Sequence, residues 1–186
     1  ASLVLAACGG DDGGSDDDEI TEAIEQASTS DSAERCTEVQ TQAFTEQTQF
    51  STGEDAVTSC EEGAGDGENA GESVEVEGVE VDGDSATADV TFIGGGLDGQ
   101  VLAISLLKEE DKWKVDSLDE FLSFDKAAFS AALLEQSSSD SEIPEQVVTC
   151  LEQALSSTPD EQLQAAYLSG DQDQLLALFG PCFGVA

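Results

Sequence analysis

Five cysteines carry the most reactive side chains of this sequence, and they limit the chemistry available to it. They are Cys8, Cys36, Cys60, Cys150 and Cys182. The 186 residues include no histidine, which removes Ser-His-Asp and Cys-His catalysis as well as histidine-ligated metals. No glycine-rich segment matches a phosphate-binding loop. We therefore predict no catalytic residue, no metal site and no cofactor.

Cys8 stands in a segment with the features of a lipidation site. Leu5-Ala6-Ala7-Cys8 follows apolar Leu3-Val4 and precedes Gly9-Gly10. It resembles the lipobox of bacterial lipoprotein signal peptides, in which small residues precede the cut and the cysteine carries a diacylglyceryl thioether. Residues 1–7 are then a signal-peptide remnant, and Cys8 begins the mature chain. The alternative is an ordinary thiol in an N-terminal extension.

The other four cysteines are suited to two disulfides, because an exported protein folds in an oxidising compartment. Four cysteines allow three pairings. We favour Cys36–Cys60 and Cys150–Cys182, since each pair lies within one sequence-local unit. The alternative is four buried free thiols.

The chain is strongly acidic, with 42 Asp and Glu against five Lys and Arg and a formal net charge of −37. Repulsion excludes nucleic acid as a partner and opposes adsorption to an anionic membrane surface. No stretch after residue 8 is long and apolar enough to span a bilayer. Attachment to the membrane is therefore predicted to depend on the acyl chains at Cys8, of which two or three anchor firmly.

The N-terminal part is predicted to consist of a tether followed by helices. Residues 8–17 are mostly Gly, Asp and Ser, so we expect a solvated, flexible segment. A folded α+β domain is expected over 18–120, beginning with three short helices. These helices cover residues 18–28, residues 32–40 and a segment that starts at the capping box of Ser51 and Glu54. A polar turn is expected between Phe44 and Phe50.

A four-stranded antiparallel meander is predicted between residues 73 and 117, because apolar and polar residues alternate between turn signals. The turns are Asp82-Gly83, Gly94 to Gly99 and Glu110-Asp111. The strand from Val101 to Leu107 is nearly continuously apolar, which is typical of a central strand covered on both faces.

The order of these segments carries a family resemblance. The Cys36 and Cys60 pair comes first, then Val79-Glu80-Val81-Asp82-Gly83-Asp84-Ser85-Ala86-Thr87-Ala88, and then Trp113-Lys114-Val115-Asp116. Over residues 18–120 the chain resembles the small cystatin-like, nuclear-transport-factor-two-like domains of actinobacterial lipoproteins. The resemblance implies a curved sheet wrapped around helices, forming a cone with an apolar pocket.

The remaining residues are predicted to be helical. Residues 121–141 form a connecting helix and a serine-rich linker. Residues 142–186 form a small tail of three short helices, which Cys150–Cys182 closes because so few residues scarcely hold a fold without a crosslink. The predicted fold class is α+β: three short helices on a four-stranded curved antiparallel meander, plus a small all-α disulfide-closed tail.

The candidate site residues belong to the expected cone pocket. Phe92, Ile104 and Trp113 are the candidate pocket-lining side chains, and the alternative for them is an ordinary core position. The resemblance implies that any catalysis would be proton transfer by a pocket aspartate, often with a tyrosine donor. The carboxylates available are Asp89, Asp98 and Asp116, for which a solvated surface position is favoured. The only tyrosine, Tyr167, falls outside the matching region.

Three of the five basic residues, Lys108, Lys112 and Lys114, fall on one predicted hairpin. Protection of a sheet edge is favoured for them over binding of an acidic ligand.

We predict a membrane-anchored extracytoplasmic lipoprotein that acts as a non-enzymatic binding or interaction module for an unidentified protein or small-molecule ligand. One alternative is an isomerase- or dehydratase-type enzyme that uses the cone pocket. Another is a structural component of the cell envelope. An open pocket with a buried carboxylate favours the enzyme, whereas a cone filled by its own side chains favours the interaction or structural role.

Overall fold

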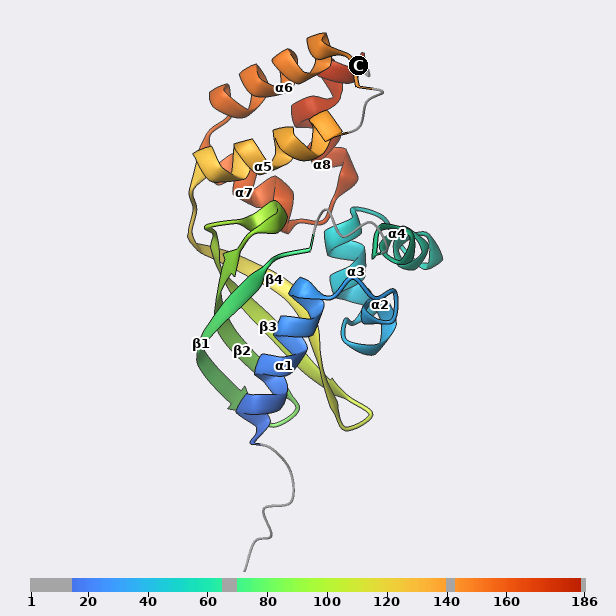
Figure 1. Cartoon of the computed structure of the whole chain (residues 1–186), viewed down its shortest axis with the longest axis vertical. Coiled ribbons are helices and arrows are strands. Elements are labelled where there is room, and N and C mark those ends of the chain that lie inside the picture. The colour runs from blue at the N-terminus through green and yellow to red at the C-terminus, as the bar shows by residue number, and fades with distance from the viewer. Residues whose placement is uncertain (1–14, 65–69, 140–142, 185–186) are drawn as a thin grey trace, which may run out of the picture.

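The computed structural model describes residues 15–64, 70–139 and 143–184. In it, a four-stranded sheet is packed by helices on one face, and a second group of helices sits at one end of the sheet (Figure 1). The predicted lipidation site at Cys8 and most of the predicted tether over 8–17 lie outside the described residues.

Within the described residues, four helices precede the sheet where the sequence predicted three. They are α1 (Asp16–Thr29), α2 (Arg35–Glu38), α3 (Gln42–Gln49) and α4 (Glu54–Ala64). The polar turn expected between Phe44 and Phe50 was wrong, because these residues form most of α3. The Thr41 hydroxyl caps this helix by accepting a hydrogen bond from the Phe44 amide at 3.2 Å. Only Phe44 and Thr45 of α3 are buried, so the helix lacks the apolar stripe that would predict it.

The sheet is an antiparallel meander, as predicted, but its last strand continues to Ser123, so the connecting helix expected from residue 121 begins only at Lys126. Its strands are β1 (Ser73–Asp82), β2 (Ser85–Ile93), β3 (Val101–Glu109) and β4 (Lys112–Ser123), in the order β1-β2-β3-β4. Register shifts interrupt β1 beside Gly78, which has φ +61°, and occur at three points between β3 and β4. Such bulges bend strands and increase their twist. Helix α1 contacts both β1 and β4, the two edges, so the sheet curves around it.

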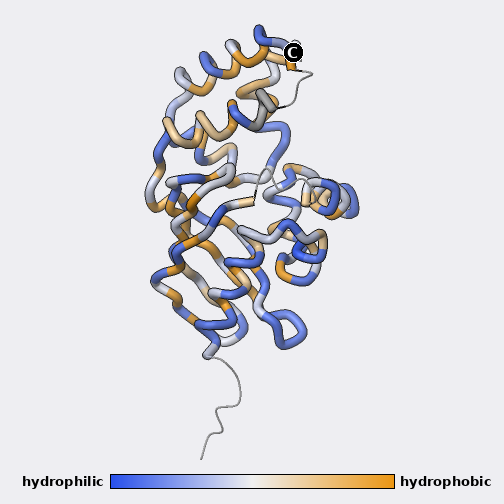
Figure 2. The backbone as a smooth tube through the Cα atoms, viewed as in Figure 1, coloured by the Kyte–Doolittle hydropathy of each residue, from blue (hydrophilic) through white to orange (hydrophobic). Residues whose placement is uncertain are grey.

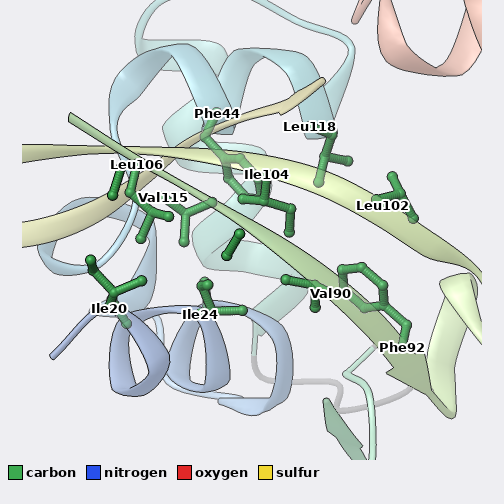
Figure 3. Packing of buried hydrophobic residues seen from close by; sticks show 14 of the residues in the cluster. Ile20, Ile24, Phe44, Val90, Phe92, Leu102, Ile104, Leu106, Val115 and Leu118 are labelled. Carbon is green, nitrogen blue, oxygen red and sulfur yellow. The ribbon is translucent and has the colours of Figure 1, made fainter. Parts of the chain in front are cut away.

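The core lies between α1, α3 and the inner face of the sheet. Ile20 and Ile24 of α1 are fully buried and point toward Leu106 and Val115 of the strands (Figure 3). The alternation of apolar and polar residues along the strands is visible in Figure 2. The expectation that β3 is covered on both faces was wrong, because Leu107 is 39% exposed and none of the described helices covers the outer face (Figure 1).

The helical unit, residues 126–183, follows β4 directly. It consists of α5 (Lys126–Ser139), α6 (Glu145–Ser157), α7 (Asp160–Leu168), α8 (Gln172–Phe179) and the short 3₁₀ helix η2 (Gly180–Phe183). Three residues of the predicted serine linker, 137–139, belong to α5, and the rest of that linker lies outside the described residues. Helix α5 packs against α6, and α7 packs against β4. The connecting helix is therefore part of the same unit as the tail (Figure 1).

Two disulfides join these elements, in the pairing favoured from the sequence. Cys36–Cys60 links α2 to α4 with a Cα–Cα distance of 6.0 Å. Cys150–Cys182 links α6 to η2 with a Cα–Cα distance of 5.5 Å. No helix of the described segments combines the length and apolar character needed to cross a bilayer.

Candidate ligand-binding cavity

The sheet cavity is an opening of about 440 Å³ between α1, α2, α3 and the inner face of the sheet. Its volume is within the range of ligand pockets, roughly 300–1,000 Å³. The strands contribute Phe92, Ile104, Val115 and Leu118 to its wall, and α5 and α7 contribute Leu133 and Tyr167. The four strand side chains are also members of the buried core, so the opening borders the core and does not replace it. Its wall combines these apolar side chains with polar residues from the helices and loops, which include Arg35, Gln40, Thr48 and Gln49.

Arg35, the first residue of α2, is the one basic side chain that lines the sheet cavity. Its Nη1 donates to the Ser30 carbonyl at 2.6 Å, and its Nε is buried without a hydrogen-bond partner in the described structure. Burial lowers the pKa of the Arg35 guanidinium, an effect that the nearby Asp31 carboxylate opposes. The group nonetheless stays protonated at any physiological pH.

Arg35 differs from the other four basic residues in its partners. All four lysines are ion-paired, with Nζ–O distances between 2.9 and 3.3 Å. Arg35 makes no ion pair with a described residue, although the chain carries 42 acidic side chains. An unpaired, partly buried cation is costly, because neither water nor a counter-charge fully solvates it.

Two sets of contacts position Arg35. The adjacent Cys36 is held to α4 by its disulfide with Cys60, whose side chain also lines the cavity. The segment after α2 is held to the sheet, because the Thr41 amide donates to the Val115 carbonyl at 2.9 Å and the Val115 amide donates to the Val39 carbonyl at 2.9 Å. Arg35 is therefore fixed relative to β4 as well as to α4.

The predicted pocket residues fall in two places. Phe92 and Ile104 line the sheet cavity. Trp113 does not line it: its Nε1 donates to Asp16 Oδ1 at 3.0 Å, and Lys108 Nζ lies 5.2 Å from its ring centre. Trp113 thus packs at the start of α1, where the same Asp16 oxygen accepts from Lys108 at 2.9 Å.

None of the three candidate carboxylates is among the described residues that line the sheet cavity. Asp89 is exposed, in line with its alternation away from the apolar face. Asp98 Oδ1 accepts from the Gly94 amide at 2.7 Å and holds the loop before β3. Asp116 Oδ1 accepts from the Thr41 hydroxyl at 2.8 Å, and this hydrogen bond joins β4 to the start of α3.

The three hairpin lysines are engaged with acidic neighbours. Lys108 pairs with Asp16 and Lys112 with Glu38, while Lys114 pairs with Glu109 of its own hairpin. Two of these pairs hold α1 and α2 to the β3–β4 hairpin, so the lysines contribute to docking of helices on the sheet edge. Exposed pairs of this kind contribute little to stability, because water and salt screen the charges.

Sequence reasoning did not identify Arg35 and did not place Tyr167 at the cavity. Arg35 is the only arginine and adjoins a disulfide cysteine, which is a usable signal. Tyr167 is brought to the cavity by the packing of α7 on β4, which no local pattern encodes. It stacks edge-on against Phe129 with ring centres 5.3 Å apart, and its burial raises the pKa of the phenol to about 12.

The helical cavity is a second, smaller opening of about 200 Å³ inside the helical unit. Leucine and phenylalanine side chains of α5 to α8 and η2 form nearly all of its wall. Phe50, Leu133 and Tyr167 line both this cavity and the sheet cavity, so the two openings share a wall.

No known protein family, curated protein or solved structure matches this chain. Within the described segments, no three or more Cys, Asp or Glu side chains converge in a way that could hold a metal ion. The features of this chain that bear on function are the geometry of the cavities and the sequence of the N-terminal segment.

Proposed function

We propose that the protein is a membrane-anchored extracytoplasmic lipoprotein that binds a small-molecule ligand in the sheet cavity without transforming it. The observation that carries the binding role is Arg35, a cation without an ion-pair partner in the wall of a 440 Å³ cavity. A ligand that pairs with this guanidinium supplies a direct ion pair, which the nearby Asp31 carboxylate does not make in the described structure.

Binding is proposed rather than catalysis because of the ionisable groups that line the cavity. Arg35 remains a cation, and the raised pKa of Tyr167, about 12, keeps the phenol protonated and a weak acid. Cys60 is held in a disulfide. A general acid or base works best with a pKa near the operating pH, and these groups lie far from it.

The proposed anchor is the acylated Cys8, on the basis of the Leu5-Ala6-Ala7-Cys8 lipobox pattern. A charge of −37 keeps the body away from anionic headgroups, which supports a role in which acyl chains alone hold the protein at the membrane. The curved meander around α1, with a cavity beside it, supports the proposed relationship to cystatin-like, nuclear-transport-factor-two-like domains.

Native mass spectrometry of protein extracted mildly from its own membrane tests both parts of the proposal. We expect a polypeptide mass that begins at Cys8, with acyl chains added and four hydrogens removed by the two disulfides. We also expect an additional non-covalent mass, which is lost from an Arg35→Gln variant. An unmodified mass that retains Ala1 overturns the anchor, and a ligand-free wild type overturns the binding role.

A further inference from the structure

The two cavities together specify more about the ligand than either one alone. The sheet cavity offers a single cation, and the helical cavity offers a nearly continuous apolar wall. Phe50, Leu133 and Tyr167 line both, so the two cavities are neighbours on the two sides of these side chains, and a ligand that enters both must displace them. We propose, building on the binding role above, that the ligand is a long-chain monocarboxylate with its head at Arg35 and its chain directed toward the helical unit.

The head group follows from the guanidinium. Nη1 of Arg35 is engaged by the Ser30 carbonyl, whereas Nε has no partner in the described structure. Nε and the adjacent Nη2 form the edge of a guanidinium that donates two parallel hydrogen bonds to a carboxylate. Because Nε is buried, a carboxylate reaches this edge through a shift of the Arg35 side chain, and there it satisfies the Nε–H and neutralises the charge at the same time.

The charge of the ligand's head group is inferred from the charged residues around it. Arg35 is the only basic residue among the described residues that line the cavity, and the whole chain has a net charge of −37. A second negative charge on the ligand would be left without a counter-charge in an environment where unpaired charges are costly. The site therefore favours a monoanion over a phosphate dianion or a dicarboxylate.

We infer the alkyl chain of the ligand from the apolar side chains of the sheet cavity and from the position of the helical cavity. Beyond Arg35, the sheet cavity presents side chains such as Ile24, Phe44, Ile104 and Val115. The helical cavity lies on the other side of the shared wall, and Leu163 and Leu178 are among its lining residues. An alkyl chain gains affinity for each methylene that it transfers from water to such surfaces, by a factor of roughly three to four.

The test measures the affinity of the full chain, with Cys8→Ser to prevent acylation, for three probes after extraction of bound lipid. The probes are palmitate, octanoate and the uncharged hexadecanol, titrated by calorimetry. We expect palmitate to bind at least about a hundredfold more tightly than octanoate. Arg35→Gln should weaken both carboxylates by about tenfold or more and leave hexadecanol unchanged. Lys112→Gln, which removes an exposed ammonium paired with Glu38, is the matched control and should change none of the three.

Two further variants test whether the alkyl chain of the ligand enters the helical cavity. Leu178→Trp and Leu134→Trp each enlarge a side chain on the wall of the helical cavity, from different helices. Each should weaken palmitate by about tenfold or more while octanoate binding stays within about twofold. Thermal unfolding identifies a variant that is misfolded. The remaining variant then shows whether the alkyl chain enters the helical cavity.

The failure modes are distinct. If octanoate and palmitate bind equally and both depend on Arg35, the long-chain inference is overturned while the binding role in the sheet cavity stands. If hexadecanol binds and neither carboxylate binds, the assignment of Arg35 to the head group is overturned. If no probe binds, the inference is overturned, and if native mass spectrometry of the wild type finds no ligand, the proposed binding role falls as well.

Discussion

The side-chain Nε2 of Gln47 on α3 donates to the backbone carbonyl of Leu168 on α7 at 2.7 Å, which connects residues that are 121 positions apart. The same amide donates to the Leu118 carbonyl at 2.8 Å, and its Oε1 accepts from the Leu118 amide at 2.8 Å. One side chain therefore ties the helical unit, β4 and α3 together. These are the elements that meet where the two cavities share a wall.

Gln47→Ala should destabilise the protein by about 2–3 kcal/mol, because it removes these three hydrogen bonds and leaves partly buried backbone groups unsatisfied. Urea unfolding measures the change. Gln42→Ala is the control on the same helix, since Gln42 is exposed and bonds only Glu46 at 2.7 Å, and it should cost about 0.5 kcal/mol or less. Equal costs for the two variants would contradict a docking role for Gln47.

Gly170, which follows α7, tests the same contact between the helical unit and α3. It has φ +62°, and a Cβ placed there would lie 2.6 Å from the Cα of Gln47. Gly170→Ala should therefore destabilise by about 2–4 kcal/mol, since backbone strain adds to a clash with backbone atoms. Gly53 has nearly the same φ, +64°, with nothing within 4 Å of its added Cβ. Gly53→Ala should cost only about 1–2 kcal/mol by chemical denaturation, and no difference between the two would refute the close approach.

The two disulfides should differ in function more than in stability. They close loops of similar length, with sequence separations of 24 and 32, so the chain-entropy model predicts that their contributions differ by only about 0.3 kcal/mol. Cys36–Cys60 positions α2 and Arg35, whereas Cys150–Cys182 closes the helical unit. Replacing Cys36 and Cys60 by serine should weaken octanoate binding severalfold, and replacing Cys150 and Cys182 should not. Calorimetric titration of both double variants decides, and the opposite order of affinities would rule out a positioning role for Cys36–Cys60.

The sheet was the most predictable part of this fold. Alternation along β2 and β4 and the turns at Gly83 and Glu110-Asp111 are local signals, and the structure places a strand on each side of them. The disulfide pairing could also be predicted, because each bond joins cysteines that are close in sequence. Helix α3 was not predictable, since only Phe44 and Thr45 of this helix are buried and its outward residues are polar.

The candidate site was predicted only in part, for a physical reason. Phe92 and Ile104 follow from strand alternation, because the inner face of a curved sheet faces whatever the cone encloses. Arg35 and Tyr167 reach the cavity through tertiary contacts that bring α2 and α7 to β4. Such contacts depend on groups like Val115 and Gln47 far away in sequence, and no local spacing encodes them. Trp113 has the same alternation as Phe92, yet the Asp16 carboxylate engages its indole elsewhere.

Asp16 should make the packing of α1 sensitive to acid. Its hydrogen bond with Lys108 is the largest cause that lowers the pKa of this carboxyl below the usual 3.8, and the bond from Trp113 also lowers it. A lowered pKa means that the stability from Asp16 is fully present above pH 3.8 and is lost as the pH falls through the lowered value. Trp113 is the only tryptophan, so its fluorescence reports the contact directly. Asp16→Asn should abolish the acid transition of that fluorescence, and an unchanged transition would assign it to another carboxyl.

Tyr167 should titrate at alkaline pH in the folded protein and at an ordinary value after unfolding. Burial raises the pKa of this phenol from 10.0 to about 12, because the phenolate is poorly solvated among apolar side chains. The raised pKa means that the stabilising effect of the neutral phenol is complete below pH 10 and is lost as the pH rises toward 12. Tyr167 is the only tyrosine, so ultraviolet absorbance follows its ionisation without interference. A midpoint near 10 in native protein would mean that water reaches the wall shared by the two cavities, whereas a midpoint near 12 that falls to about 10 in concentrated urea supports the enclosed position.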